Sequence, residues 1–397
     1  MNKAQVLVIA LFAAIPFFAF LAFPNGLVGT DPFYFYAITC NNAEPNATTP
    51  MLSASFFQIF PCDLILFKSL FFILILISSL IVAKTGELFN KDYGWLAGIL
   101  VFLSSQWTNQ HMRIEDDVLA YPILFLANYF FIKGELEKSN GFRLIAVALI
   151  IFTGLFMWRG ALLYLLAYSF FWLISTIITI AILLYIGFGA LNQFLPNVKV
   201  VENKLAIGLG FLGLGHGLAF LGLYGLTRGL WLLIPFLLAG FINAKFAIHA
   251  APLLAIGLMF LVLDLKKIVR HTNIESYIKN YFTTICIGIV FIQLIVLSIM
   301  ILFAAPHTNQ MEAVQDTIAL AKQYDTNISN DWSYGYYFRY YGAVPLNEGG
   351  GDYNSYAIRP AIVLTEDTIN QIDYSQCNLI KNYGKGFNYE LKTYKCG

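Results

Sequence analysis

The chain has 397 residues, of which 58% are hydrophobic and 12% are charged, and its mean hydropathy is +0.68. A single soluble domain of this size does not carry so much apolar surface, so the sequence predicts an α-helical protein with several membrane spans. The net charge is only +1, and no run of Lys and Arg is interleaved with aromatic residues, which excludes nucleic acid as a partner.

Apolar runs long enough to cross a lipid bilayer occupy most of the first 305 residues. The first run, from Ala4 to Phe23, has the length of a spanning helix and lacks a small-residue cleavage site, so we expect a retained span and not a signal peptide. The predicted spans are 4–24, 64–84, 93–107, 117–133, 142–157, 160–190, 205–225, 229–243, 246–264 and 280–305.

Charges between the runs predict the orientation of the chain. Segment 265–279 carries four Lys or Arg residues and segment 25–63 carries none, so the first is predicted to be cytoplasmic and the second external. Successive loops must alternate between the two sides of the membrane. This alternation agrees with the charges if run 160–190 is two short or tilted spans, which gives about eleven crossings and places 191–204 outside. One long tilted helix would instead give ten spans and an external basic segment, against the charge rule.

The composition becomes polar and aromatic from Pro306 onward. An amphipathic helix at 312–324 and a strand "AIVL" at 361–364 predict a small α/β domain over residues 306–397, on the external face. The preceding part, residues 1–305, is predicted to form one transmembrane domain.

The five cysteines are distributed in two polar pairs and one apolar site. Cys40 and Cys62 lie in the first polar segment, and Cys377 and Cys396 lie in the tail. Because both segments are expected to face an oxidising compartment, each pair is predicted to form a disulfide, with Cys286 as a core thiol. The alternative is four free thiols.

Acidic residues occur in three predicted external segments, 25–63, 108–116 and 191–204, or at their ends. Carboxylates from separate loops that meet at a membrane surface make an oxygen site suited to Mg²⁺ or Mn²⁺. Asp31, before Pro32, is also explained as a turn or cap residue, and Glu202 as a solvated loop residue. The run of three at 115–117 is more informative, because a helix cap uses one carboxylate. The candidate catalytic carboxylates are Asp31, Glu115, Asp117 and Glu202.

Two cations, Arg159 in "WRG" and Lys245 in "NAKFAIHAAP", lie at predicted external helix ends. Either is suited to bind a phosphate or pyrophosphate head group. Extension of a long side chain to the interface explains Arg159 equally well.

Several motifs, taken together and in order, resemble a known family. "DWSYGYY" at 331–337 resembles the WWDYG motif of the catalytic subunit of oligosaccharyltransferase, a member of the C-type glycosyltransferase superfamily. "DPFYFY" from Asp31 is similar to the first external loop of that family, and "EDDVLAYP" from Glu115 to its second-loop acidic motif. "WRGALLYLL" and "KFAIHAAPLL" resemble its Trp-Gly stretch and the Arg-Phe motif before its penultimate span.

The resemblance implies roles for individual residues. Asp31, Glu115 and Asp117 take the positions of metal ligands and catalytic carboxylates, and Glu202 is a loose match to a loop glutamate over the acceptor. Lys245 takes the position of the motif arginine. The implied acceptor-binding residues are Asp331, Trp332, Ser333, Tyr334 and Gly335, of which Asp331 replaces the first Trp and Ser333 replaces the Asp of the motif.

The sequence therefore predicts a multi-pass membrane glycosyltransferase of C-type architecture. It would transfer a glycan from a polyprenyl (dolichyl) phosphate or pyrophosphate to protein asparagine on the external face of the cell membrane. Its partners would be this lipid-linked glycan, an acceptor protein or peptide, and the bilayer. A transferase that uses a polyprenyl-phosphate sugar to modify a hydroxyl of a protein or glycolipid is the near alternative. A lipid-linked sugar transporter or flippase is the distant one.

Overall fold

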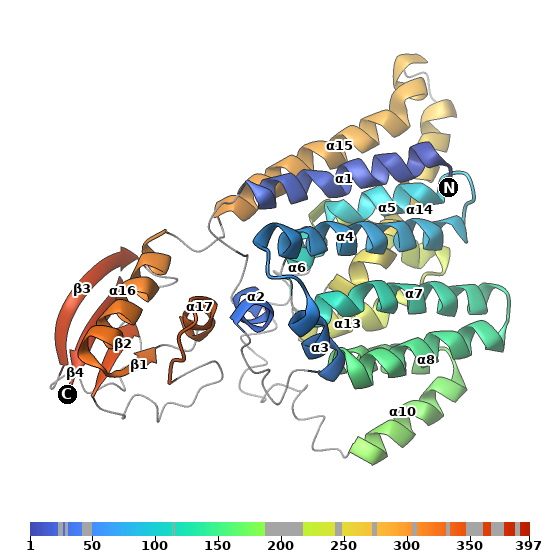
Figure 1. Cartoon of the computed structure of the whole chain (residues 1–397). Helices are drawn as coiled ribbons and strands as arrows, with labels where there is room; N and C mark the ends of the chain where they lie inside the picture. Colours follow the sequence, from blue (N-terminus) through green and yellow to red (C-terminus); the bar gives the residue numbers. More distant parts are fainter. Residues whose placement is uncertain are drawn as a thin grey trace.

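The computed structural model describes most of the chain as helix, with a small C-terminal sheet (Figure 1). The described residues are 1–22, 27, 31–41, 50–112, 114, 116–186, 217–242, 248–271, 276–303, 308–330, 334–346, 360–366, 377–385 and 390–397.

Among the described residues, helices make up the first three quarters of the chain and strands occur only in its last part. The α-helices are α1 (Lys3–Leu21), α2 (Asp31–Asn41), α3 (Met51–Ile59), α4 (Leu64–Glu87), α5 (Ala97–Leu100), α6 (Ser105–Met112), α7 (Asp116–Leu136), α8 (Asn140–Phe156), α9 (Leu163–Ser169), α10 (Leu173–Ile186), α13 (Leu233–Ile242), α14 (Ala251–His271), α15 (Ser276–Phe303), α16 (Thr308–Tyr324) and α17 (Gly335–Tyr340). The 3-10 helices are η1 (Gly94–Leu96), η2 (Val101–Leu103), η3 (Arg159–Leu162) and η5 (Gly217–Arg228). The strands are β1 (Asn327–Asn330), β2 (Ala361–Thr365), β3 (Cys377–Lys385) and β4 (Glu390–Cys396).

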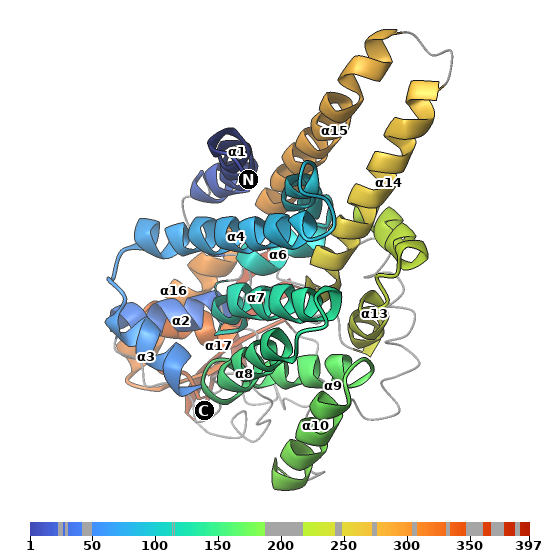
Figure 2. The same ribbon diagram turned by 90° about the vertical axis from the view of Figure 1, so that its right-hand side faces the viewer.

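Helices α1 to α15 form a helical body. Within the described residues, four helical segments are long and apolar enough to cross a membrane: Lys3–Leu21, Leu64–Glu87, Ile248–Val269 and Tyr281–Ile299. Figure 2 shows α14 and α15 rising side by side from this body, in agreement with their contacts. The chain is therefore a helical protein with candidate membrane spans.

The described part of the long apolar run 160–190, residues 160–186, is not one continuous helix. Helix α9 ends at Ser169 and α10 begins at Leu173. The break is held by side chains, because the hydroxyl of Thr176 donates to the carbonyl oxygen of Ser169 at 3.0 Å and that of Ser175 donates to the carbonyl oxygen of Leu165 at 3.1 Å.

Several ion pairs lie at one end of the helical body, which we call the charged end. The amino group of Met1 lies 2.6 Å from Glu87 at the end of α4, and Arg143 of α8 lies 2.8 Å from Glu135 of α7. Arg228 of η5 pairs with Asp264 of α14. Helices α2, α3 and α6 lie at the opposite end, together with the sheet, and we call this the sheet end (Figure 1).

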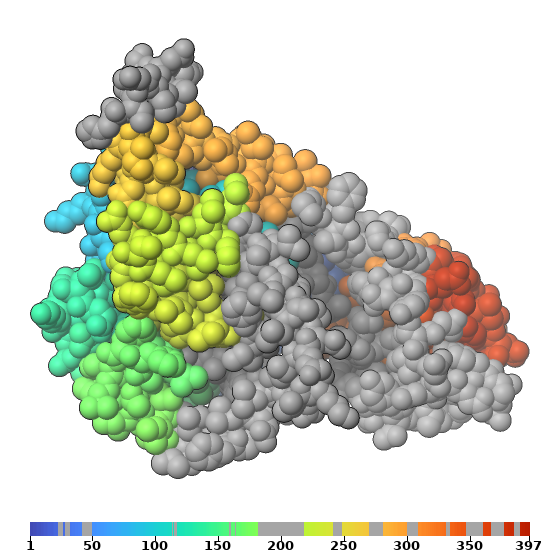
Figure 3. All heavy atoms as spheres, turned by 180° about the vertical axis from the view of Figure 1, so that it is seen from behind, coloured from blue at the N-terminus to red at the C-terminus, as the bar shows by residue number. Residues whose placement is uncertain are grey.

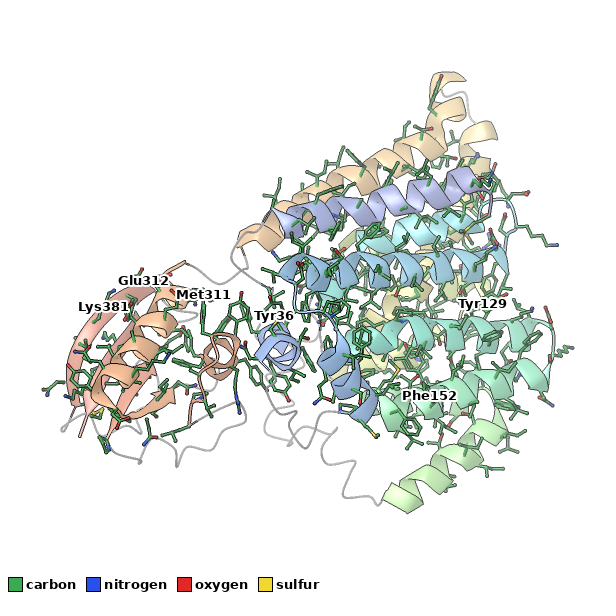
Figure 4. The ribbon with its side chains drawn as sticks, in the orientation of Figure 1. Tyr36, Tyr129, Phe152, Met311, Glu312 and Lys381 are labelled. Atoms are coloured by element: carbon green, nitrogen blue, oxygen red, sulfur yellow. A yellow bond between two sulfur atoms is a disulfide. The ribbon has the colours of Figure 1, made fainter. Side chains whose placement is uncertain are left out.

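The C-terminal part, from α16 to β4, is the sheet domain. Its sheet has the order β1-β2-β4-β3, in which β1 and β2 are parallel and the other pairs are antiparallel. Helix α16 packs on β2 and β4, and Lys381 of β3 reaches Glu312 of α16 at 2.8 Å (Figure 4). Figure 3, from behind, shows the described strands at the far side of the molecule from α13 and α14. The predicted helix 312–324 and strand 361–364 are confirmed as α16 and β2.

Segment 25–63, predicted as an external segment between two spans, contains α2 and α3. Pro32 lies in the first turn of α2, where a proline costs no helical hydrogen bond. In the predicted loop 108–116, residues up to Met112 belong to α6 and Asp116 begins α7. The segments expected to carry chemistry are thus largely short helices at the sheet end.

Candidate functional site

The first-loop motif and the tail motif, which lie almost 300 residues apart, are in direct contact. Helix α2 carries the first and α17 the second, and the two pack through aromatic rings. The ring centroid of Phe33 is 4.5 Å from that of Tyr337 and 5.0 Å from that of Tyr340, and Tyr34 is 5.0 Å from Tyr336. Burial, and then the neighbouring Tyr36 and Tyr341, raise the pKa of Tyr340, so this ring stays neutral.

The contact between α2 and α17 is also a polar one. The side-chain amide of Asn41, the last residue of α2, donates to the carbonyl oxygens of Arg339 and Tyr340, at 2.9 and 3.0 Å. These carbonyls belong to the last turn of α17, where helix carbonyls lack partners within the helix. Tyr36, on α2, lies between the helical body and α17 (Figure 4).

The tail motif begins with residues 331–333, so Asp331, Trp332 and Ser333 lie outside the described residues. Tyr334 and Gly335 are both buried, and Tyr334 is the residue that precedes α17. The hydroxyl of Tyr334 donates to Oε1 of Glu366 at 2.5 Å. Burial, followed by this hydrogen bond, raises the pKa of Tyr334 well above its usual range.

Asp117 lies in the first turn of α7, with only 2% of its surface exposed. The hydroxyl of Tyr121, one turn later, donates to Oδ2 of Asp117 at 3.0 Å. The N-terminus of a helix favours negative charge, which helps to offset the cost of burying this carboxylate. Asp31 begins α2 but its side chain is not described, and Glu115 lies outside the described residues.

A buried cluster of aromatic rings and histidines adjoins Asp117. The ring of His249 lies 5.4 Å from Trp158 and 5.5 Å from Tyr121, and its Nδ1 is 2.6 Å from the hydroxyl of Tyr164. His111 of α6 lies 5.4 Å from Tyr121. Three motif segments, "EDDVLAYP", "WRGALLYLL" and "KFAIHAAPLL", therefore meet in one cluster.

The cations predicted to bind phosphate belong to two of these segments. Arg159 follows Trp158 and begins η3, although its side chain is not described. Lys245 lies four residues before His249, and Glu202 lies in 187–216; both are outside the described residues. His249 and Tyr121 are not among the predicted site residues. Both lie within the quoted motifs, and the structure adds them to the cluster beside Asp117.

The described residues contain no group of three His, Cys, Asp or Glu side chains placed to hold a metal ion. Of the three predicted ligands, Asp117 is the one with a described side chain. A buried carboxylate at a helix N-terminus supplies the oxygen that Mg²⁺ or Mn²⁺ prefers, so this part of the predicted donor set fits such an ion.

Two disulfides, the same pairs that the sequence predicts, stabilise the elements around the site. Cys40–Cys62 joins α2 to the segment before α4, and Cys377–Cys396 joins β3 to β4. Cys286, in α15, is a free thiol.

Comparison with known proteins gives no assignment for this chain: no family model matches it, and no curated protein matches it.

Proposed function

We propose that this protein is a membrane glycosyltransferase, related to the catalytic subunit of oligosaccharyltransferase, with about eleven spans of C-type architecture. It transfers a glycan from a polyprenyl phosphate or pyrophosphate to asparagine of a protein. The observation that carries the proposal is the convergence of motifs: α2 contacts α17, and Tyr121, Trp158 and His249 meet in one cluster. Unrelated packing residues would not be expected to coincide with the segments that the family resemblance selects.

The directions of the helices support the proposed crossings. Helix α1 runs from the charged end to the sheet end, α4 runs back, residues 94–112 lead to the sheet end again, α7 runs to the charged end, and α8 runs from there to the sheet end (Figure 1). The ammonium of Lys266 donates to the hydroxyl of Tyr93 at 3.1 Å, which brings the basic segment 265–279 beside the connection that follows α4. Basic connections favour the cytoplasm, so the sheet end, with the sheet domain, would be external.

The chemistry follows from residues at the sheet end. A bound Mg²⁺ or Mn²⁺ would neutralise charge that develops on the departing phosphate. Asp117, held by Tyr121, together with Asp31 and Glu115, would hold the ion, and a carboxylate of this set or Glu202 would orient the acceptor amide. Lys245 and Arg159 would bind the lipid phosphate through charged hydrogen bonds. Residues 331–335 would bind the acceptor.

One sequence feature favours a second acceptor class. Ser333 stands where the family motif has Asp, so the carboxylate expected to read a sequon hydroxyl is replaced. A transferase that modifies a hydroxyl of a protein or glycolipid, with a polyprenyl-phosphate sugar as donor, is therefore the second candidate.

The test uses the full chain in lipid nanodiscs, polyprenyl-phosphate and polyprenyl-pyrophosphate glycans, and peptides with Asn-x-Thr, Asn-x-Ala or Thr alone. Asp117→Asn and Asp31→Asn should each lower transfer by about 100-fold or more, since each removes a charged ligand. Glu137→Gln, at the charged end and 52% exposed, is the matched control and should keep the wild-type rate. Full activity of Asp117→Asn and Asp31→Asn would refute the proposed site, and a requirement for Thr without Asn would select the second candidate.

A further inference from the structure

The parallel strands β1 and β2 end at the same edge of the sheet. Asn330, the last residue of β1, pairs with Leu364, and Thr365 and Glu366 follow directly. Asn330 and Thr365 are fully buried and Glu366 is 5% exposed. Buried polar side chains require hydrogen-bond partners, so the polar groups at this edge are suited to hold the segments that follow β1 and β2.

Three chain segments meet at one hydroxyl on this edge. Tyr334 follows β1 by four residues, and its hydroxyl donates to Glu366, which follows β2. Gln310, in the first turn of α16, lies beside the same hydroxyl and acts to lower the pKa of Tyr334, against the larger effect of burial. A donor–acceptor distance of 2.5 Å lies in the range of hydrogen bonds from a hydroxyl to a charged carboxylate.

Tyr334 lies between the tail motif and α17, so its hydrogen bond to Glu366 can affect both segments. In the sequence, Tyr334 directly follows the motif residues Asp331, Trp332 and Ser333. It also directly precedes Gly335, the first residue of α17. The far side of α17 packs on α2, which begins at Asp31. Tyr334 therefore connects the tail motif to the sheet, and α17 connects it to α2.

We propose that Glu366 is a positioning residue for the tail motif: by accepting the hydrogen bond of Tyr334 it holds Tyr334 and the start of α17 at the edge of the sheet, and so keeps the tail motif in the geometry that binds the acceptor. The part of this inference that concerns the acceptor rests on the proposed function. Sequence alone does not select Glu366, because it lies 32 residues after Tyr334 and outside every motif.

The variants separate the hydrogen bond from the packing of the ring. Tyr334→Phe removes the donor and keeps the ring, Glu366→Leu removes the acceptor, and Glu366→Gln keeps an acceptor oxygen. Tyr324→Phe, at an exposed tyrosine, and Glu390→Gln, at an exposed glutamate of β4, are the matched controls. Each protein is measured as the full chain in nanodiscs.

Kinetics test the role in acceptor binding. Tyr334→Phe and Glu366→Leu should raise the KM for the acceptor peptide about tenfold and leave the KM for the lipid-linked donor unchanged. Glu366→Gln should stay within about threefold of wild type, and the double variant Tyr334→Phe with Glu366→Leu should be no worse than either single one. An equal rise of both KM values, or additive effects in the double variant, would overturn the role of Glu366 in acceptor positioning.

Hydrogen exchange of the amides of residues 334–341 tests the tether without any activity. We expect at least tenfold faster exchange in Tyr334→Phe and Glu366→Leu, and wild-type exchange in both controls. Unchanged exchange in the first two variants would overturn the tether. A wild-type protein that transfers no glycan from any donor would refute the proposed function instead, and the exchange rates would still decide whether Glu366 holds this segment.

Discussion

Asp117 is more deeply buried than a capping role requires. A carboxylate that caps a helix only has to accept hydrogen bonds from the free amide groups of the first turn. Capping Asp and Glu residues are therefore usually exposed to solvent. Burial of a carboxylate is unfavourable unless charges or hydrogen bonds compensate for it. At Asp117 a helix N-terminus and the hydroxyl of Tyr121 contribute to this compensation. Under the proposed function, a bound divalent cation would add to it.

The cysteines allow a direct test at the residue scale. Denatured, unreduced protein should take up one alkyl group, on Cys286, and reduced protein should take up five. Each disulfide closes a loop of about 20 residues, so Cys377→Ala with Cys396→Ala should lower the free energy of unfolding of the sheet domain by about 3 kcal/mol. Mass spectrometry after alkylation, and denaturant unfolding, measure the two effects. Five alkylations without reduction would contradict the pairing.

At the scale of elements, η5 and α14 approach each other unusually closely. A Cβ atom at Gly222 would overlap the carbonyl group of Leu254, and one at Gly257 would overlap that of Gly222. Small residues permit such backbone contact between membrane helices, where packing, and not the hydrophobic effect, drives association. Both glycines therefore belong to the interface itself.

Gly222→Ala should destabilise this pair of helices by at least about 2 kcal/mol, because backbone atoms, unlike the end of a flexible side chain, cannot move aside cheaply. Gly288→Ala, in α15, is the control: its new methyl group would meet no atom within 4 Å, and alanine favours the helix. Thermal unfolding in nanodiscs should show a lower Tm for the first variant only. Equal Tm values would mean that the two helices are not in contact.

The sequence predicts those elements whose signals are local. Hydropathy locates α1, α4 and α15, the helical spacing of apolar residues locates α16, and the apolar run "AIVL" locates β2. Helices α2 and α3 are too short to be stable alone and depend on their packing partners, which no local pattern reveals. The same reason explains why no sequence pattern identifies His249 and Glu366. The partner of His249, Tyr164, is 85 residues away, and that of Glu366 is 32 residues away.

At the scale of the whole molecule, the two ends differ in the kinds of side-chain contact that they contain. The charged end holds the ion pairs of Met1, Arg143 and Arg228, and Lys266 reaches Tyr93 there. The sheet end presents aromatic contacts, buried histidines and a domain with its own disulfide. Basic residues favour the cytoplasm and disulfides form in oxidising compartments, so the proposed orientation, with the sheet end external, predicts both differences.

A pair of lysines tests this orientation and the number of crossings together. In a Cys286→Ala background, Lys91→Cys places a thiol at the charged end and Lys322→Cys places one on the exposed face of α16. With about eleven crossings, a membrane-impermeant maleimide should label Lys322→Cys on intact cells and Lys91→Cys only after permeabilisation. Ten crossings would leave both thiols on the inside, because Lys91 follows two predicted spans and Lys322 follows them all. Labelling of neither on intact cells, with both labelled after lysis, would therefore reject an external sheet domain and with it the proposed transfer on the external face.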